Sequence, residues 1–285
     1  MKIAIASGKG GTGKTMVSAN LFYSLCSAGM KVSLVDCDAE EPNAAEFISG
    51  GSAGVSLVCQ KLPVINTEKC TFCGKCFEYC NYHAIVFLPP ANFIQVVSDL
   101  CHDCGACVYA CEYGAITEIN KELGKVNTTQ VNGQCRLIEG RINVGVYSPV
   151  PVIKKAIQSL NGEDIAIFDS PPGISCPFIA TVVRADYVVL VTEPTPFGLN
   201  DLKLSVATLE QLDRPYGVIV NKAGLGNREV YEWIAQKNIP LLMEIPFDKE
   251  IARIYSEGRL LAEEIDGYQK GFLVLLEKIK QAYHE

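Results

Sequence analysis

The chain has 285 residues, of which 48% are hydrophobic and 20% charged, which predicts a soluble protein with one large α/β domain and a small additional module. Its formal net charge of −7 argues against a broad basic surface for nucleic acid. No apolar run approaches the length of a membrane span and no leader precedes the first motif, so we expect a cytoplasmic protein without stable membrane insertion.

The first motif is a glycine-rich loop between a predicted strand and a predicted helix. An alternating apolar run from Lys2 to Ala6 predicts the strand, and a helical pattern that stops at Gly29 follows the loop. Lys14 is expected to reach the β- and γ-phosphates of a nucleotide, while the Thr15 hydroxyl binds Mg²⁺ and the loop N–H groups hold phosphate oxygens. The loop fits the P-loop pattern G-x-x-x-x-G-K-T and reads Gly8-Lys9-Gly10-Gly11-Thr12-Gly13-Lys14-Thr15.

Lys9 gives the loop a more specific character. A lysine directly after the first glycine resembles the deviant P-loop of the MinD/ParA-type ATPases, which are related to the nitrogenase iron protein. The resemblance implies a doubly wound, mostly parallel sheet and a dimer that closes face to face over two ATP molecules. It also implies that Lys9 crosses the interface to the partner's phosphates. The partner is expected to be a second copy or a similar ATPase; a solvated loop lysine is the alternative.

Two aspartates follow the second predicted strand, which runs from Lys31 to Val35. Side chains at the carboxyl ends of parallel strands face the crevice where open α/β sheets bind ligands. The family resemblance implies that Asp38 orients the attacking water and that Asp36 lies near Mg²⁺. A helix N-cap is the alternative role of Asp38.

From about Pro63 to Ile119 the nucleotide-binding pattern is interrupted by two matching cysteine runs. Ala84-Ile85 and Ala115-Ile116 follow the two runs at the same offset, so the segment is an internal repeat. We therefore predict an inserted domain over 63–119 between ATPase segments 1–62 and 120–285. The runs share the spacing C-x₂-C-x₂-C-x₃-C and consist of Cys70, Cys73, Cys76 and Cys80, then Cys101, Cys104, Cys107 and Cys111.

The repeat resembles a bacterial two-cluster ferredoxin, in which the fourth cysteine of each run binds the other cluster. The resemblance assigns one [4Fe–4S] cluster to Cys70, Cys73, Cys76 and Cys111, and the second to Cys101, Cys104, Cys107 and Cys80. Ferredoxin runs usually have proline after the fourth cysteine, whereas Asn81 and Glu112 stand here. Two Cys₄ zinc sites are the alternative.

The ATPase pattern resumes with a connecting segment over 121–141, a strand over 142–146 and a helix over 150–160. An apolar strand, 165–168, then ends at Asp169, which is expected to hold Mg²⁺ as a Walker B aspartate. The following Ser170-Pro171-Pro172-Gly173 resembles the second switch of MinD-like and Mrp-like ATPases. Further strands are predicted over 187–191 and 216–220. The resemblance implies adenine contacts by Asn221 and Pro246. A last amphipathic helix over 271–283 is expected to pack on the protein's own core.

Five of the thirteen cysteines lie outside the two runs. Cys26 and Cys59 are expected to fill apolar space, Cys37 lies between Asp36 and Asp38, and Cys135 has no evident partner in the sequence. Cys176 lies seven positions after Asp169, the offset of a cluster ligand in the nitrogenase iron protein. No second cysteine lies near Tyr147, where the other ligand of a cluster bridging two subunits should fall. Cys176 is therefore expected only to face its counterpart across a dimer.

The leading interpretation is an ATP-hydrolysing protein with Mg²⁺, ATP or ADP and two [4Fe–4S] clusters, in which nucleotide-dependent dimerisation is coupled to electron transfer. One alternative is an ATP-dependent carrier or scaffold for iron–sulfur or metal-centre maturation. The other is a regulatory ATPase in which the cluster state controls dimerisation. Each requires a redox protein or metalloprotein as partner.

Overall fold

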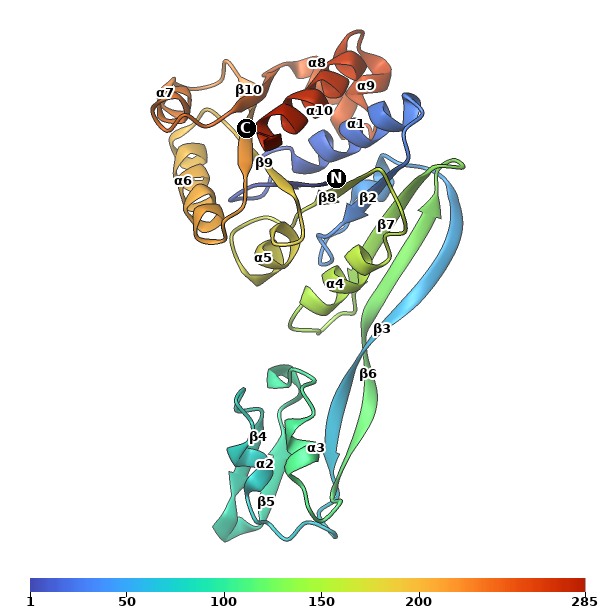
Figure 1. The fold of residues 1–285 in the computed structure, drawn as a ribbon, viewed down its shortest axis with the longest axis vertical. Coiled ribbons are helices and arrows are strands. Elements are labelled where there is room, and N and C mark those ends of the chain that lie inside the picture. The colour runs from blue at the N-terminus through green and yellow to red at the C-terminus, as the bar shows by residue number, and fades with distance from the viewer. Residues whose placement is uncertain (285) are drawn as a thin grey trace. The chain divides into compact units, whose positions relative to one another are not determined.

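The computed structural model describes residues 1–284 and divides them into two compact units, whose elements are labelled in Figure 1. Unit 1 comprises residues 1–56, 125–142 and the chain from Pro149 onward, and unit 2 comprises residues 57–124 and 143–148. The predicted insert, 63–119, lies within unit 2. Each unit has its own core and is described by itself.

A nine-stranded sheet runs through the described residues in the order β11-β10-β9-β1-β8-β2-β7-β6-β3. The pairings from β11 to β7 are all parallel, as expected for a doubly wound α/β fold. The strands are β1 (Lys2–Ala6), β2 (Val32–Asp36), β3 (Gly51–Ile65), β6 (Ile116–Gln130), β7 (Cys135–Ile142), β8 (Ile165–Asp169), β9 (Tyr187–Thr192), β10 (Tyr216–Ala223) and β11 (Leu241–Pro246).

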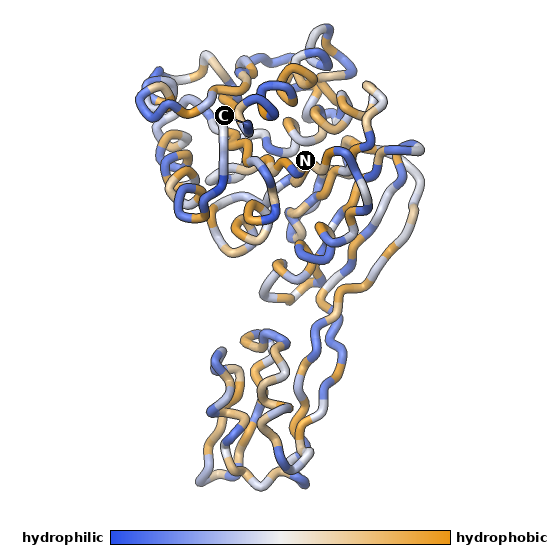
Figure 2. The backbone as a smooth tube through the Cα atoms, in the orientation of Figure 1, coloured by the Kyte–Doolittle hydropathy of each residue, from blue (hydrophilic) through white to orange (hydrophobic). Residues whose placement is uncertain are grey.

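Helices cover both faces of this sheet because its central strands are apolar on both sides. Every residue of β8 and β9 is buried, and the centre of the sheet is predominantly hydrophobic in Figure 2. One face packs against α1 (Lys14–Ser27), α8 (Lys249–Ser256), α9 (Leu261–Glu264) and α10 (Tyr268–His284). The other is covered by α4 (Val150–Gln158), α5 (Cys176–Val182), α6 (Pro196–Gln211) and α7 (Glu229–Gln236) (Figure 1).

The amphipathic helix predicted near the C-terminus packs on the core of unit 1. In α10, the apolar stripe of Phe272, Leu275, Leu276 and Ile279 is buried against α1 and the sheet. A stripe that is already buried is not available to a bilayer surface. None of the described helices combines the length and the apolar character that crossing a membrane requires.

Unit 2 is a small α/β unit whose core includes five of the eight predicted cluster ligands. Beside parts of β3 and β6 it has α2 (Lys75–Glu78), β4 (Ile85–Leu88), β5 (Phe93–Val96) and α3 (Ala106–Ala110), with β4 antiparallel to β5. Ile85, Ile94 and Ile116 are buried at its centre together with Cys76. Four more cysteines of the two runs pack against this group: Cys70, Cys80, Cys107 and Cys111.

One strand prediction is wrong. The segment 121–141 was expected to be a connector followed by a strand over 142–146, but β6 and β7 occupy the connector and β7 ends at Ile142. The charged Arg136 and Glu139 interrupt the apolar pattern of β7, which hid the strand. Arg136 is accommodated there because it forms an ion pair with Glu163, whose side chain is 5% exposed.

A disulfide joins two cysteines for which the sequence suggested no pairing. Cys26, near the end of α1, is bonded to Cys135, the first residue of β7, across a sequence separation of 109 residues. The prediction that Cys26 only fills apolar space, and that Cys135 is unpaired, is therefore wrong. The pairing depends on α1 packing against β2, whose neighbour in the sheet is β7, a tertiary arrangement that neither local sequence reveals.

Candidate nucleotide site and cysteine pockets

The loop between β1 and α1 has the backbone that a phosphate cradle requires. Gly11 and Gly13 have φ values of 75° and 97°, in the left-handed region that favours glycine. A Cβ at Gly13 would lie 2.4 Å from the Asn221 Nδ2 atom, so no other residue fits there. A Cβ at Gly10 or Gly11 would meet nothing within 4 Å, which leaves open space beside the loop.

Lys14, the first residue of α1, is brought close to two carboxylates. The side chain is buried, and this burial lowers the pKa of Lys14, while the charges of Asp169 and Asp38 oppose the shift. Asp169 ends β8 and Asp38 lies two residues after the end of β2, and these two strand ends are neighbours because Asp36 is in register with Asp169. The structure thus brings the predicted Lys14, Asp38 and Asp169 together at one edge of the sheet.

Asp169 has an unused oxygen at this edge. The residue is 1% exposed, and burial raises its pKa to about 6, although the hydroxyl of Thr15 and the charge of Lys14 oppose the shift. Its Oδ1 atom has no hydrogen-bond partner among the described residues. A buried carboxylate oxygen without a partner is costly unless a cation or a donor binds it. Hard oxygen ligands of this kind suit Mg²⁺.

Both carboxylate oxygens of Asp36, unlike Asp169 Oδ1, accept hydrogen bonds from the backbone. Its Oδ1 accepts the N–H of Asp38 at 3.0 Å, and its Oδ2 accepts the N–H groups of Asn43 and Ala44, both at 3.0 Å. Burial, followed by the charge of Asp169, raises the pKa of Asp36 well above its usual range. The carboxylate therefore fastens the loop after β2 to the strand end, and its predicted place near Mg²⁺ stays a prediction.

Asp38 itself is half-buried in that loop. Burial raises its pKa, while the N–H of Glu41 and the charge of Lys14 act in the opposite direction. Because Asp36 holds the backbone of Asp38, the position of the Asp38 carboxylate depends on the fastened loop. The predicted role of Asp38 in orienting water is compatible with this position beside Lys14.

The sequence analysis missed Glu193, which binds the signature lysine. The Lys9 Nζ atom lies 3.4 Å from Glu193 Oε2, and the Lys222 Nζ atom lies 2.5 Å from Glu193 Oε1. Burial favours a raised pKa, but the bonds from Lys222 and Lys9 outweigh it and lower the pKa of Glu193. Glu193 directly follows β9, as Asp169 ends β8, so an acidic residue at a strand end was the available signal.

Asn221 and Pro246 lie on the adjacent strands β10 and β11, close to the P-loop. Ala223 is in register with Pro246, and the ends of the two strands are joined by the Phe247 N–H, which donates to Ala223 O at 2.9 Å. The Asn221 Nδ2 donates to Thr12 O at 2.7 Å, so its amide braces the P-loop. The predicted adenine contacts of both residues stay predictions.

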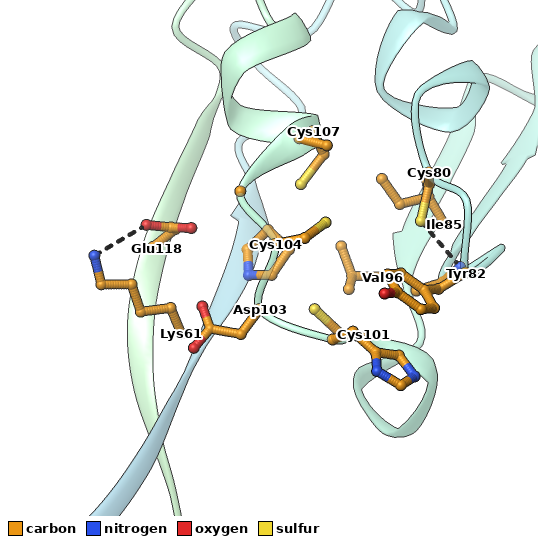
Figure 3. A pocket seen from close by; sticks show the side chains of 15 residues that line it. Lys61, Cys80, Tyr82, Ile85, Val96, Cys101, Asp103, Cys104, Cys107 and Glu118 are labelled. Atoms are coloured by element: carbon orange, nitrogen blue, oxygen red, sulfur yellow. Dashed lines mark hydrogen bonds and ion pairs between the residues drawn. The ribbon is translucent and has the colours of Figure 1, made fainter. Parts of the chain in front are cut away.

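In unit 2 a pocket gathers four cysteines from the two runs (Figure 3). Cys101, Cys104 and Cys107 line it together with Cys80, the last cysteine of the first run. Figure 3 shows the four Sγ atoms facing a common space. The space between the lining residues, including the part open to solvent, is about 410 Å³, and we refer to it as the Cys101 pocket.

A second pocket gathers the other four cysteines. Cys70, Cys73 and Cys76 line it together with Cys111, the last cysteine of the second run, and its space, including the part open to solvent, is about 340 Å³. We refer to it as the Cys70 pocket. The exchange of the fourth cysteine between the two pockets is the arrangement that the ferredoxin resemblance implies. Within residues 1–284, no three His, Cys, Asp or Glu side chains are grouped closely enough to hold a single metal ion.

Cys176 lies apart from both pockets. It is exposed at the start of α5, directly after Ser175. The proposed pairing of Cys176 with its counterpart in a second copy stays a prediction.

Comparisons with known proteins agree with this fold and site. The family profile for the CobQ/CobB/MinD/ParA nucleotide binding domain matches residues 3–261. An uncharacterized protein of Methanocaldococcus jannaschii is 34% identical over 265 residues, with 90% of each chain covered. An iron-sulfur cluster carrier protein of Pyrococcus horikoshii is 24% identical over 98% of this chain and 85% of its own length. The septum site-determining protein MinD of that organism, solved with Mg-ADP, covers 98% of this chain and 96% of its own, with a TM-score of 0.59 and 22% identity.

Proposed function

Since the chain belongs to the CobQ/CobB/MinD/ParA nucleotide-binding family, we propose that it is an ATPase whose nucleotide state acts on two [4Fe–4S] clusters bound by unit 2. The observation that carries the proposal is the division of eight cysteines between two pockets in the crossed pattern. The nucleotide would be held in unit 1 by the P-loop, with Lys14 on the phosphates.

The residues of unit 1 fit Mg-ATP. The open space beside Gly10 and Gly11 accommodates phosphate oxygens near the loop N–H groups. Asp169 Oδ1 offers a buried, unpartnered acceptor near Thr15, as a magnesium ligand requires. Asp38 would orient the water that attacks the γ-phosphate, and Lys14 would stabilise the charge on the phosphates.

The residues of unit 2 fit cubane clusters. A [4Fe–4S] cluster takes one thiolate for each iron, so its ligands surround a space, whereas a single zinc ion draws four ligands to one point. Four sulfur atoms around the space in Figure 3 suit the first arrangement. When bound, such clusters supply one-electron redox chemistry. The ligands would be Cys70, Cys73, Cys76 and Cys111 in one pocket and Cys80, Cys101, Cys104 and Cys107 in the other.

Iron analysis tests this proposal. Protein purified without oxygen should contain about eight iron atoms per chain and absorb broadly in the visible range. Replacing exposed Cys59, which lines neither pocket, with serine should leave the iron content unchanged. Stoichiometric zinc with little iron in the anaerobic protein would contradict the cluster proposal.

Electron transfer is the function that the burial of the cysteines supports best. Five of the eight cysteines belong to the apolar core of unit 2, with Cys76 fully part of it. A cluster bound there contributes to folding and is therefore expected to be retained. The second candidate is a carrier that hands clusters to other proteins, which the printed name of the Pyrococcus horikoshii relative favours. Incubating the loaded protein with an apo-ferredoxin separates the two, because a carrier loses iron to the acceptor.

A nucleotide-dependent dimer is part of the proposal. Lys9 is held by Glu193 in the single chain, and ATP binding would draw it to the phosphates of a partner subunit. Light scattering with ATP should then show a dimer that Lys9→Ala prevents. Lys237→Ala removes an exposed lysine remote from the loop and serves as a control. A parent protein that stays monomeric with bound ATP would contradict this part.

Hydrolysis provides a separate test. Asp38→Ala should retain ATP binding, because Lys14 and the P-loop remain, but lose most of the hydrolysis rate. Asp164→Asn, which changes an exposed carboxylate of the same unit, is the matched control. An unchanged hydrolysis rate in Asp38→Ala would remove this residue from the mechanism.

A further inference from the structure

The two cysteine pockets differ at positions that the internal repeat makes equivalent. Phe72 of the first run corresponds to Asp103 of the second, since each directly precedes the second cysteine of its run. Both have a left-handed backbone, with φ values of 55° and 54°, so the repeat is preserved in conformation. The side chains are not equivalent, because one is an aromatic ring and the other a carboxylate.

Asp103 places an uncompensated negative charge at the Cys101 pocket. It lines that pocket and takes part in no ion pair among the described residues. The lysines and the glutamate that line the two pockets are each paired. In the Cys101 pocket Lys61 lies 3.6 Å from Glu118, and beside the Cys70 pocket Lys75 lies 2.5 Å from Glu112. With His102 neutral, Lys61, Asp103 and Glu118 give the lining of the Cys101 pocket a net charge of −1, whereas the Lys75–Glu112 pair at the Cys70 pocket is neutral.

The number of backbone N–H donors to sulfur also differs between the two pockets. The Ala84 N–H donates to Cys80 Sγ at 3.3 Å and the Ala115 N–H donates to Cys111 Sγ at 3.4 Å, one bond in each pocket. The Cys70 pocket has a further one, from the Phe72 N–H to Cys70 Sγ at 3.4 Å. Within the described residues Cys101 Sγ, its counterpart, accepts no such bond from Asp103.

Both differences act on the reduction potential of a bound cluster. Reduction adds negative charge, so donors to the sulfur atoms stabilise the reduced state and a nearby carboxylate destabilises it. The additional N–H donor raises the potential in the Cys70 pocket, and Asp103 lowers the potential in the Cys101 pocket. Because Asp103 is exposed, solvent and salt weaken its contribution.

We infer that the two clusters are electronically inequivalent, with the lower potential in the Cys101 pocket and Asp103 as the residue that sets it. This inference rests on the proposed cluster binding. A single electron from a low-potential donor would reside in the Cys70 pocket, and the Cys101 pocket would be reduced second. The cluster in the Cys101 pocket is therefore the stronger reductant of the two.

A redox titration with dithionite, followed by EPR, tests the inference on the full-length protein. Iron is measured first, so failure of cluster binding is separated from failure of the ordering. The parent should be reduced in two steps. Asp103→Asn should move the lower step to higher potential and leave the upper step in place, and the shift should shrink as salt is added. Asparagine tolerates the left-handed backbone at this position.

A reciprocal change addresses the other pocket. Thr71 is an exposed residue that lines the Cys70 pocket and corresponds to His102 in the repeat. Thr71→Asp should move the upper step to lower potential, while Thr71→Asn should not. Glu68→Gln removes an exposed carboxylate of unit 2 that lines neither pocket and is the control for general charge effects.

The outcomes are distinguishable. Movement of the lower step alone in Asp103→Asn, with the reciprocal effect in Thr71→Asp, supports the assignment. Three results overturn the ordering and leave cluster binding intact. They are movement of the upper step in Asp103→Asn, a single reduction step in the parent, and the same two potentials in the parent and all variants. Absence of iron in the anaerobic parent overturns the proposed function and the ordering together.

Discussion

In unit 1 the candidate site lies at the edge of a core that is complete without it, whereas in unit 2 five of the eight candidate ligands belong to the core. Lys14 and Asp169 are added to a sheet whose strands are already buried on both faces. In unit 2 only a few aliphatic residues are buried, and Cys76 is one of the residues at the centre. The comparison indicates that ligand binding and folding are separable in unit 1 and linked in unit 2.

The physical reason is size. A unit of the length of residues 57–124 buries little apolar surface, and small domains of this kind are commonly stabilised by a metal centre. Unit 1 contains enough apolar residues to fold around an empty phosphate loop. Loss of a ligand should therefore produce a functional defect in one unit and a structural defect in the other.

The largest expected effect is the loss of unit 2 on removal of a buried ligand. Cys76→Ser should reduce the iron content by half or more and make residues 57–124 sensitive to protease, because the core loses a cluster that holds it together. Nucleotide binding by unit 1 should persist. Mass spectrometry of limited digests locates the cleavage, and Cys59→Ser is the control. Equal protease resistance in Cys76→Ser and the parent would break the comparison.

The next effect should be confined to unit 1. Lys14→Ala removes the buried cation of the phosphate site and should weaken ATP binding by about a hundredfold or more. Iron content and the visible spectrum should not change, since the variant leaves unit 2 untouched. Calorimetric titration with ATP measures the effect, and Lys2→Ala, at an exposed residue of β1, is the control. Loss of iron in Lys14→Ala would show that the units do not respond separately.

A smaller effect concerns the Cys26–Cys135 disulfide, through which the stability of unit 1 also depends on cysteine chemistry. Replacing Cys26 and Cys135 with alanine should lower the free energy of unfolding of unit 1 by about 2–5 kcal/mol. Thermal unfolding is measured with and without a thiol reductant. The reductant should bring the parent to the stability of the variant and leave the variant unchanged. Equal stability of the oxidised parent and the variant would contradict the prediction.

The smallest effect is a pH dependence of unit 1. Burial favours a raised pKa for Glu163, but hydrogen bonds from its own backbone N–H, from Ser33, from Arg136 and from the Asn161 N–H outweigh burial and lower the pKa below its usual 4.5. A lowered pKa means that this stabilisation is present above pH 4.5 and is lost as the pH falls through the folded-state value. Glu163→Gln should cost about 1–3 kcal/mol at neutral pH and flatten the acid limb of the unfolding profile. Asp164→Asn should keep the parental profile.

Local patterns predicted much of unit 1 because its strands and motifs are contiguous. The strand, loop and helix around Lys14 lie within one short segment, and Asp169 stands at the end of an apolar run. The Cys26–Cys135 bond and the contact of Glu193 with Lys9 were missed because they join residues 109 and 184 positions apart. The edges of the insert were not predictable either, since β3 and β6 each run without interruption from one unit into the other.

The cysteine spacing anticipated which residues line each pocket, but not how the pockets differ. An internal repeat is recognised from the positions at which its two copies agree. The difference between the two pockets arises at an equivalent position where the copies disagree, Phe72 and Asp103. The identity of a cluster and its role in electron transfer depend on chemistry that spacing cannot supply. Those parts of the function remain proposals.

The disulfide also has a topological consequence. Cys26 and Cys135 close a covalent ring that contains the entire continuous segment 57–124 of unit 2. A single cut anywhere between the two cysteines therefore opens the ring without releasing a fragment. Oxidised protein nicked in this segment migrates as one species, and only reduction separates it into two pieces. Residues 57–124 thus lie within a covalently closed ring, and the disulfide keeps the two flanking parts of unit 1 joined when the chain of unit 2 is cut.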